Sequence, residues 1–130
     1  MTSDGAGNRT VVDLKPFLPA RDFDLSRRFY ADLGFQEIWA NAEIAEFEID
    51  GHRFLLQNYY VKGQSENFMM SLTVEDPDAW WAHIEEVGLK AKYSLGMAKP
   101  PAMQPWGLRV LYLSDPTSVL WHIVDRPTRR

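Results

Sequence analysis

Apolar and polar positions at the start of the chain predict a strand followed by a helix. Residues 11–20, VVDLKPFLPA, are mostly apolar and begin with β-branched side chains, which is typical of a strand, and their two prolines indicate an edge or an irregular end. Asp22 or Asp24 caps the helix that follows, and Gly34 ends it. Its buried stripe recurs at every fourth residue and consists of Leu25, Phe29 and Leu33.

Three extended segments come next, at residues 35–40, 44–49 and 53–60. Asp50-Gly51, between the last two, is a strong hairpin turn. The middle segment has one clean apolar face, made of Ala45, Phe47 and Ile49, and one poorly alternating face, made of Ile44, Glu46 and Glu48. Residues 61–67, VKGQSEN, are polar and predict a linker.

The same order of elements begins again at residue 68. Residues 68–74 predict a strand, and Asp76 or Asp78 caps a helix that runs through Val87 and ends at Gly88. The remaining expected segments are a short strand at residues 91–94, a loop with two prolines at 95–104, and two strands at 108–113 and 119–124 joined by the turn 114–118.

This restart indicates an internal duplication. A shift of 54 residues places Asp22 on Asp76 and Gly34 on Gly88, and it preserves the order of all five elements. We therefore predict an α+β fold of two tandem βαβββ modules, residues 11–60 and 68–126, in one domain spanning 11–126. Their strands form a curved mixed sheet around a concave pocket, with the helices outside. The alternative is an α+β domain whose halves look alike only because helix caps use Asp and Gly.

Composition narrows the function classes. The chain has 130 residues, a net charge of −4 with mixed signs and no cysteine, which argues against nucleic acid as a partner and excludes thiol catalysis and disulfides. No apolar run approaches the roughly 20 residues of a membrane helix, and the first ten residues lack the apolar core of a signal peptide. We expect a disordered polar tail at residues 1–10, no membrane partner and a cytoplasmic location.

Two motifs resemble those of the vicinal oxygen chelate superfamily of glyoxalases, extradiol dioxygenases and bleomycin-resistance proteins. Residues 29–35, FYADLGF, are similar to its FY-x-x-LGF signature, and residues 105–109, PWGLR, followed by Asp115-Pro116, are similar to the bleomycin-resistance branch. The resemblance covers residues 11–125. Thr117-Ser118 stands where the family has a Gly-Asn type of turn, which puts the turn geometry in question.

Metal-dependent members of that superfamily place His, Glu or Gln at four strand positions. The resemblance puts these positions at Lys15, Met69, His122 and either Leu55 or Gln57. A divalent ion needs three or four nitrogen or oxygen ligands, and the Lys15 ammonium would repel it. The sequence therefore predicts no metal and no other cofactor.

The predicted pocket is mostly apolar with a few polar groups, which suits a planar or amphipathic small molecule. Its expected ligand-binding residues are Lys15, Phe17, Trp39, Leu55, Gln57, Met69, Trp106, Arg109 and His122. We predict a metal-free protein that sequesters a drug-like or aromatic molecule, with antibiotic resistance as the role that the resemblance implies, and the acidic net charge would suit a cationic one. The resemblance also implies a homodimer, with modules paired within one chain or swapped between two.

Several readings stay open at this stage. No residue is assigned as catalytic, but the alternative is an enzyme of this superfamily, a lyase, dioxygenase or transferase that acts on a small metabolite with a divalent metal or with His122 as general base. A third alternative is a regulatory or structural module whose trough is filled by its own side chains. A further alternative makes His122 a hydrogen-bonded residue of the pocket wall or core, and Arg109 a structural ion-pair partner for a carboxylate such as Asp115.

Overall fold

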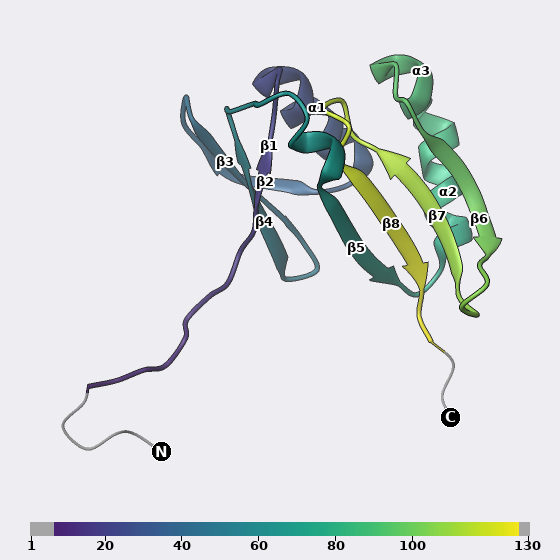
Figure 1. Ribbon diagram of the computed structural model, residues 1–130, viewed down its shortest axis with the longest axis horizontal. Coiled ribbons are helices and arrows are strands. Elements are labelled where there is room, and N and C mark those ends of the chain that lie inside the picture. Colours follow the sequence, from purple (N-terminus) through teal and green to yellow (C-terminus); the bar gives the residue numbers. More distant parts are fainter. Residues whose placement is uncertain (1–6, 128–130) are drawn as a thin grey trace.

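The computed structural model of the chain describes residues 7–127 (Figure 1). Residues 1–6 of the predicted tail, and residues 128–130, lie outside the described residues. Eight strands form two four-stranded mixed sheets, one from each half of the chain. Within the described residues, no strand of one sheet pairs with a strand of the other.

The first half forms sheet 1, with the strand order β1-β4-β3-β2. Its elements are β1 (Phe17–Pro19), α1 (Phe23–Leu33), β2 (Gln36–Ala40), β3 (Ile44–Ile49) and β4 (His52–Gln57). β1 runs parallel to β4, and the other neighbours are antiparallel. The strand expected at residues 11–20 is confined to Phe17–Pro19, because the exposed residues 7–14 form an arm that leaves the body of the molecule (Figure 1).

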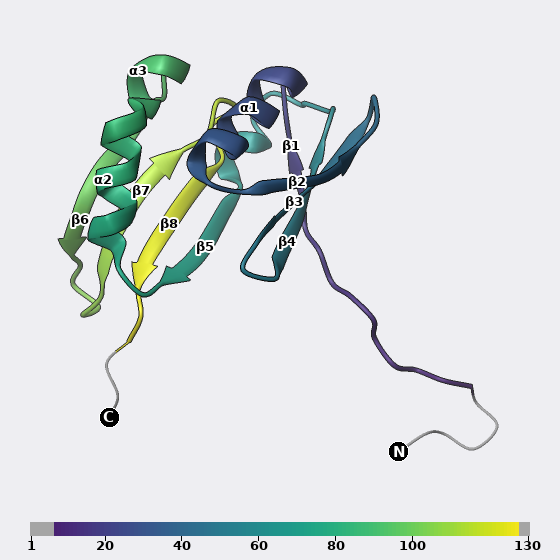
Figure 2. The same ribbon diagram turned by 180° about the vertical axis from the view of Figure 1, so that it is seen from behind.

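The second half forms sheet 2, with the equivalent order β5-β8-β7-β6. Its elements are the 3-10 helix Ser65–Asn67, β5 (Met69–Val74), α2 (Pro77–Val87), α3 (Leu89–Tyr93), β6 (Ala98–Met103), β7 (Arg109–Ser114) and β8 (Leu120–Asp125). β5 again runs parallel to β8. Seen from behind, α2 lies over one face of this sheet, and α3 follows at one end of α2 (Figure 2).

The helix caps match the predicted repeat. Asp22 accepts a hydrogen bond from the Leu25 N–H at 3.1 Å, and Asp76 accepts from Ala79 at 3.2 Å. Gly34 and Gly88 end the two helices at φ 125° and 71°, where a side chain is disfavoured. The predicted α+β fold of two βαβββ modules is confirmed.

The region between α2 and β7 differs from the sequence prediction. The strand expected at residues 91–94 is wrong, because this segment belongs to α3, whose Leu89 and Tyr93 are one helical turn apart and both buried. The loop expected at 95–104 is also wrong, because Ala98–Met103 forms β6. β6 is an edge strand with an irregular register between Lys99 and Ala102, which accommodates the two prolines.

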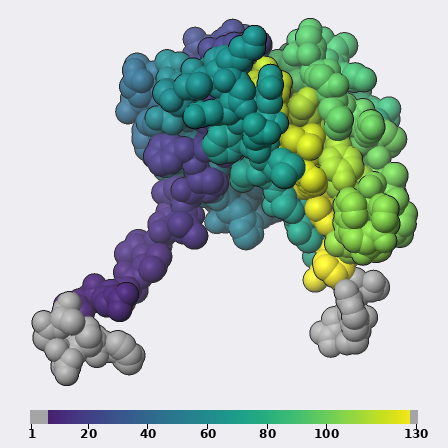
Figure 3. Space-filling model, viewed as in Figure 1, coloured from purple at the N-terminus to yellow at the C-terminus, as the bar shows by residue number. Residues whose placement is uncertain are grey.

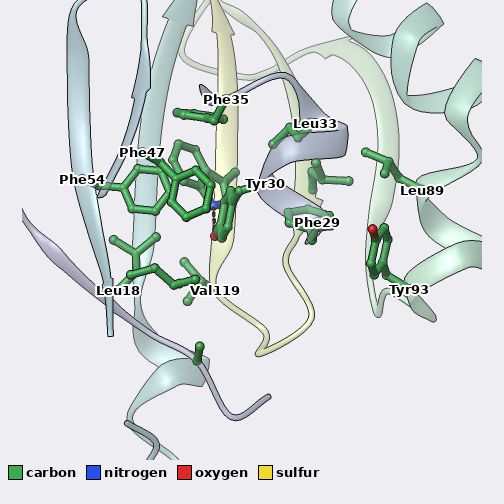
Figure 4. Packing of buried hydrophobic residues seen from close by; sticks show 14 of the residues in the cluster. Leu18, Phe29, Tyr30, Leu33, Phe35, Phe47, Phe54, Leu89, Tyr93 and Val119 are labelled. Carbon is green, nitrogen blue, oxygen red and sulfur yellow. Dashed lines mark hydrogen bonds between the residues drawn. The ribbon is translucent and has the colours of Figure 1, made fainter. Parts of the chain in front are cut away.

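One core is shared by both sheets. The Tyr30 ring of α1 lies 4.9 Å from that of Phe54 in sheet 1 and 5.9 Å from that of Trp121 in sheet 2, measured between centroids (Figure 4). Phe35 and Phe47 complete the aromatic cluster. We call the sheet faces that meet here the inner faces and their reverse sides the outer faces.

A buried hydrogen-bond network joins the modules through this core. The Tyr30 hydroxyl donates to Asp115 Oδ2 at 2.6 Å and accepts from Trp121 Nε1 at 3.0 Å. Asp115 also accepts from the backbone N–H groups of Thr117 and Val119. This turn retains a positive φ of 80° at Ser118, although no glycine is present there. A serine, whose backbone N–H donates to the Asp115 carbonyl, therefore takes the positive φ in place of the Gly-Asn type of turn.

Candidate functional site

The outer face of sheet 1 carries a row of four side chains, one from each strand. Strand register places Phe17 opposite Leu55, Leu55 opposite Glu46, and Glu46 opposite Trp39. A β-bulge between Glu37 and Trp39 turns the indole to this face. Phe17 and Trp39 keep 48% and 44% of their surface exposed. The structure thus brings three of the predicted ligand-binding residues together in one aromatic and aliphatic row.

Glu46 is the member of this row that the sequence prediction missed. Its carboxylate accepts hydrogen bonds from Trp39 Nε1 at 2.7 Å and from Arg53 at 2.8 Å, and Lys15 Nζ lies 3.2 Å away. Arg53, and then Trp39 and Lys15, hold the pKa of the Glu46 carboxyl below its usual range against the effect of burial. The only sequence signal was a glutamate on the poorly alternating face of β3, which does not reveal that it is buried.

Lys15 lies just before β1, on the same outer face. Its ammonium contacts Asp13 at 2.7 Å and Glu46 at 3.2 Å. These two carboxylates, Asp13 first, raise the pKa of Lys15, so the side chain is charged at neutral pH. A permanent cation therefore occupies the position that the family resemblance assigns to a metal ligand.

Strand register also identifies the residue equivalent to His122 in sheet 1. On β5 and β8, Met69 lies opposite Leu120, two residues before His122. The 54-residue repeat aligns Phe17 with Ser71, and Ser71 lies opposite His122. Because Phe17 lies opposite Leu55 on β4, Leu55 takes the place of His122 in the repeat. Gln57 lies one row further, opposite Ile44, and shares the outer face.

The outer face of sheet 2 carries His122 and Met69. The His122 ring packs edge-on against Tyr112 at 4.9 Å, and Ser71 lies opposite His122 in register. His122 Nε2 is buried, and it has no hydrogen-bond partner among the described residues. An unpaired buried ring nitrogen is costly, so a ligand or a second protein surface that completes this face would stabilise it.

Trp106 and Arg109 lie elsewhere. Trp106 is 61% exposed in the turn between β6 and β7. Arg109 pairs with both carboxylate oxygens of Asp78 on α2, at 2.8 and 3.0 Å, and not with Asp115 as the sequence suggested. Asp115 is instead bound to Tyr30, so this part of the prediction is corrected.

The two halves of the predicted site are separate within one chain. Sheet 1 holds Lys15, Phe17, Trp39, Leu55 and Gln57, and sheet 2 holds Met69 and His122. Within the described residues no strand of one sheet pairs with a strand of the other, so these two groups of residues lie on different sheets. Figure 3 shows β8 at the surface of sheet 2 between its neighbouring strands, with no helix over it.

The residues present do not fit a metal ion. Within residues 7–127, no three His, Cys, Asp or Glu side chains come together in a geometry that could hold one. His122 is the single strong donor at the four family positions, and Lys15 brings a positive charge. The described residues also contain no helix long and apolar enough to cross a membrane.

A groove that sequence reasoning missed lies between the β3–β4 hairpin and the free edge of β5. It encloses about 280 Å³. Its walls are mainly apolar, with Phe35, Ile49, Phe54, Met70, Leu72 and Trp121, and its polar rim has His52, Arg53, Ser71 and Thr73. Because its walls come from both modules, no local sequence pattern could have shown it.

Comparison with known proteins places this geometry in context. The model of the Glyoxalase/Bleomycin resistance protein/Dioxygenase superfamily matches residues 10–123. No curated protein matches the chain in sequence.

Three solved structures illustrate the likeness. A bleomycin-binding protein complexed with bleomycin is 23% identical with a TM-score of 0.76, covering 90% of this chain and 100% of that one. The bleomycin-binding protein of bleomycin-producing Streptomyces verticillus, complexed with copper(II)-bleomycin, is 24% identical with a TM-score of 0.71, covering 91% and 100%. A lactoylglutathione lyase from Agrobacterium tumefaciens is 15% identical with a TM-score of 0.63, covering 89% and 95%. At these identities the likeness establishes a common fold.

Proposed function

Because the chain belongs to the Glyoxalase/Bleomycin resistance protein/Dioxygenase superfamily, we propose that it is a metal-free protein that binds and sequesters a small drug-like or aromatic molecule. The observation that carries this proposal is the row on the outer face of sheet 1. Phe17 and Trp39 remain about half exposed there, although large aromatic side chains are usually covered. Two solved relatives of this fold are described as bleomycin-binding proteins, which supports the same class of function.

A second copy of the chain completes the site in this proposal. The equivalent strands β1 and β5 each end a sheet with one open edge, and Met69 on β5 is 63% exposed. Val11, Val12 and Leu14 are also exposed on an extended arm that leaves the body of the molecule (Figure 3). A twofold dimer can set the outer face of sheet 1 in one copy against that of sheet 2 in the other, which brings Trp39 and His122 into one cleft.

Ultracentrifugation tests the dimer. We expect a species of twice the 15.0 kDa chain mass, and we expect Met69→Lys on β5 to shift it toward the monomer and weaken ligand binding. A wild-type protein that sediments as a monomer at all concentrations used for ligand binding would contradict the proposed cleft.

Thermal unfolding with added compounds tests the binding function. Bleomycin and other cationic aromatic compounds at about 100 times the dissociation constant would add about 2.7 kcal/mol to the stability of the folded state. This corresponds to a rise in melting temperature on the order of 10 °C for a domain of this size. Trp39→Ala should remove the rise, whereas Met103→Ala, at a more exposed apolar position on β6, should retain it. No stabilisation by any compound of this class would count against the proposal.

The buried Nε2 of His122 favours a second candidate, a metal-free enzyme in which this nitrogen acts as general base. The sequestering protein instead uses the same nitrogen as a hydrogen-bond partner of the ligand. His122→Ala distinguishes the two functions. Loss of a general base would abolish turnover of the ligand, whereas loss of a hydrogen-bond partner would weaken its binding. Mass spectrometry of the recovered ligand is the direct measurement: an unaltered ligand supports sequestration, and a converted one supports the enzyme.

A further inference from the structure

Glu46 is one of two buried acidic residues in the described part of the chain, and the other, Asp115, belongs to the core network. The Glu46 side chain is buried, with 4% exposed, in a row whose other members are Phe17, Leu55 and Trp39. A carboxylate in such surroundings is unfavourable unless all its oxygens are paired. Trp39, Arg53 and Lys15 provide this pairing, so the site is complete only while all three contacts hold.

Lys15 differs from the other two partners of Glu46. Trp39 and Arg53 belong to strands of sheet 1, and Arg53 is held further by Glu48 at 2.7 Å. Lys15 belongs to the arm before β1, and its 3.2 Å contact with Glu46 is the longest of the three. Its shorter contact, 2.7 Å, is to Asp13 of the same arm. Lys15 can therefore leave Glu46 without breaking a strand pair.

The space that Lys15 would vacate suits one kind of ligand. Without Lys15, the charges of Glu46, Arg53 and Glu48 leave one net negative charge. The half-exposed Trp39 ring beside it attracts a cation through its π face. An anionic ligand would instead meet a buried carboxylate at close range, which is unfavourable.

We propose that the Glu46 carboxylate binds the cationic group of the ligand, a positively charged nitrogen attached to or within a planar ring system, and that Lys15 occupies this position in the free protein as an internal competitor. The inference rests on the proposed function, since it concerns the same row of residues. Lys15 then determines specificity, because a ligand without a positive charge cannot replace it at Glu46.

Fluorescence titration with two dyes tests this arrangement. Thioflavin T is planar and cationic, and anilinonaphthalene sulfonate is an aromatic anion. We expect Lys15→Met to bind thioflavin T about threefold to tenfold more tightly than the wild type, in keeping with the loss of one partly exposed ion pair. Binding of the sulfonate should not tighten. Lys90→Met, which removes an exposed lysine from α3, serves as the control and should match the wild type.

A double-mutant cycle connects the effect to Glu46. In the background of Glu46→Gln, replacing Lys15 should no longer tighten thioflavin T binding, because the carboxylate for which both cations compete is absent. Circular dichroism melting of each variant checks that it is folded. If Glu46→Gln lowers the melting temperature, the comparison of thioflavin T binding between Lys15→Met and the wild type decides the role of Lys15.

Each remaining outcome has a defined meaning. Weaker binding of thioflavin T by Lys15→Met, or an equal gain for both dyes, overturns the role of Lys15. A gain that persists in Glu46→Gln overturns the role of Glu46. If thioflavin T binds the wild type in a manner that Trp39→Ala abolishes, but Lys15→Met has no effect, the inference fails while the proposed function stands. If neither dye nor bleomycin binds the wild type or Lys15→Met, both fail.

Discussion

The Tyr30 hydroxyl joins the two modules by hydrogen bonds inside the shared core. It donates to Asp115 at 2.6 Å and accepts from Trp121 at 3.0 Å, and all three residues are buried. Tyr30→Phe removes only this oxygen, and it leaves Asp115 Oδ2 and the Trp121 indole N–H buried without their hydrogen-bond partner. Since each unpaired buried group costs about 1–3 kcal/mol, we expect the free energy of unfolding to fall by about 2–5 kcal/mol.

This cost should depend on pH, because burial raises the pKa of the Asp115 carboxyl from 3.8 to about 6. The folded state then holds the proton more tightly than the unfolded state. The stability contributed by protonated Asp115 is fully present below pH 3.8 and is lost as the pH rises through about 6, a change on the order of 3 kcal/mol. The Tyr30 hydrogen bond opposes the raised pKa by favouring the carboxylate. Its loss should therefore be more costly at pH 8 than at pH 5.

Urea unfolding of the wild type and Tyr30→Phe at pH 5 and pH 8 measures both effects. Tyr59→Phe, which removes a hydroxyl from a half-exposed ring, is the control and should change stability by less than about 0.5 kcal/mol. Equal losses for Tyr30→Phe at the two pH values would refute Asp115 as the titrating partner. A loss below about 1 kcal/mol would refute the claim that this hydroxyl joins the modules.

Three further outcomes follow from the same geometry. Ser118→Gly should raise the free energy of unfolding in urea by about 0.5–1 kcal/mol, because the φ of 80° at Ser118 strains any residue other than glycine. A lower free energy of unfolding would show that this backbone conformation is not strained. Phe54→Ala should lower the calorimetric stability by about 3–5 kcal/mol, since its ring packs against four other rings of the core; a loss under 1 kcal/mol would show that the core refills the cavity. Dialysis against EDTA should leave the melting temperature unchanged, because Lys15 and Met69 occupy metal-ligand positions, whereas a clear drop would reveal a metal.

Much of the fold could be predicted because its signals are local. The Asp22 cap and the Gly34 terminus lie within the turns that they determine, and the same is true of Asp76 and Gly88. The internal repeat then predicted that the second half has the same order of elements along the chain as the first half. Asp50-Gly51 likewise marked a hairpin through backbone conformations that few other residue pairs adopt.

The parts that failed depend on contacts between distant segments. Residues 89–93 form a helix because Leu89 and Tyr93 are buried together, and the Tyr93 hydroxyl bonds to Asp32 of α1 at 2.5 Å, 61 residues away. β6 exists because β7 pairs with it despite two prolines. Glu46 is buried only because Lys15 and Arg53 reach it from other segments. The pattern of apolar and polar residues within a single segment cannot predict these contacts, because each of them joins segments that are distant in the sequence.

The duplicated module also gives the reason for proposing that the ligand cleft uses two copies of the chain. Each module has one major helix that packs against the inner face of its own sheet, α1 on β2 and β4 and α2 on β6 and β7, and within residues 7–127 no α-helix covers either outer face. Exposed aromatic and aliphatic side chains on such faces mark surfaces that are covered by a partner or a ligand. The two faces differ, since one has the Glu46 cluster and the other has His122. In the proposed dimer, pairing of unlike faces across a twofold axis would give two identical clefts, each with one carboxylate and one imidazole, so we expect ligand affinity to depend on dimerisation.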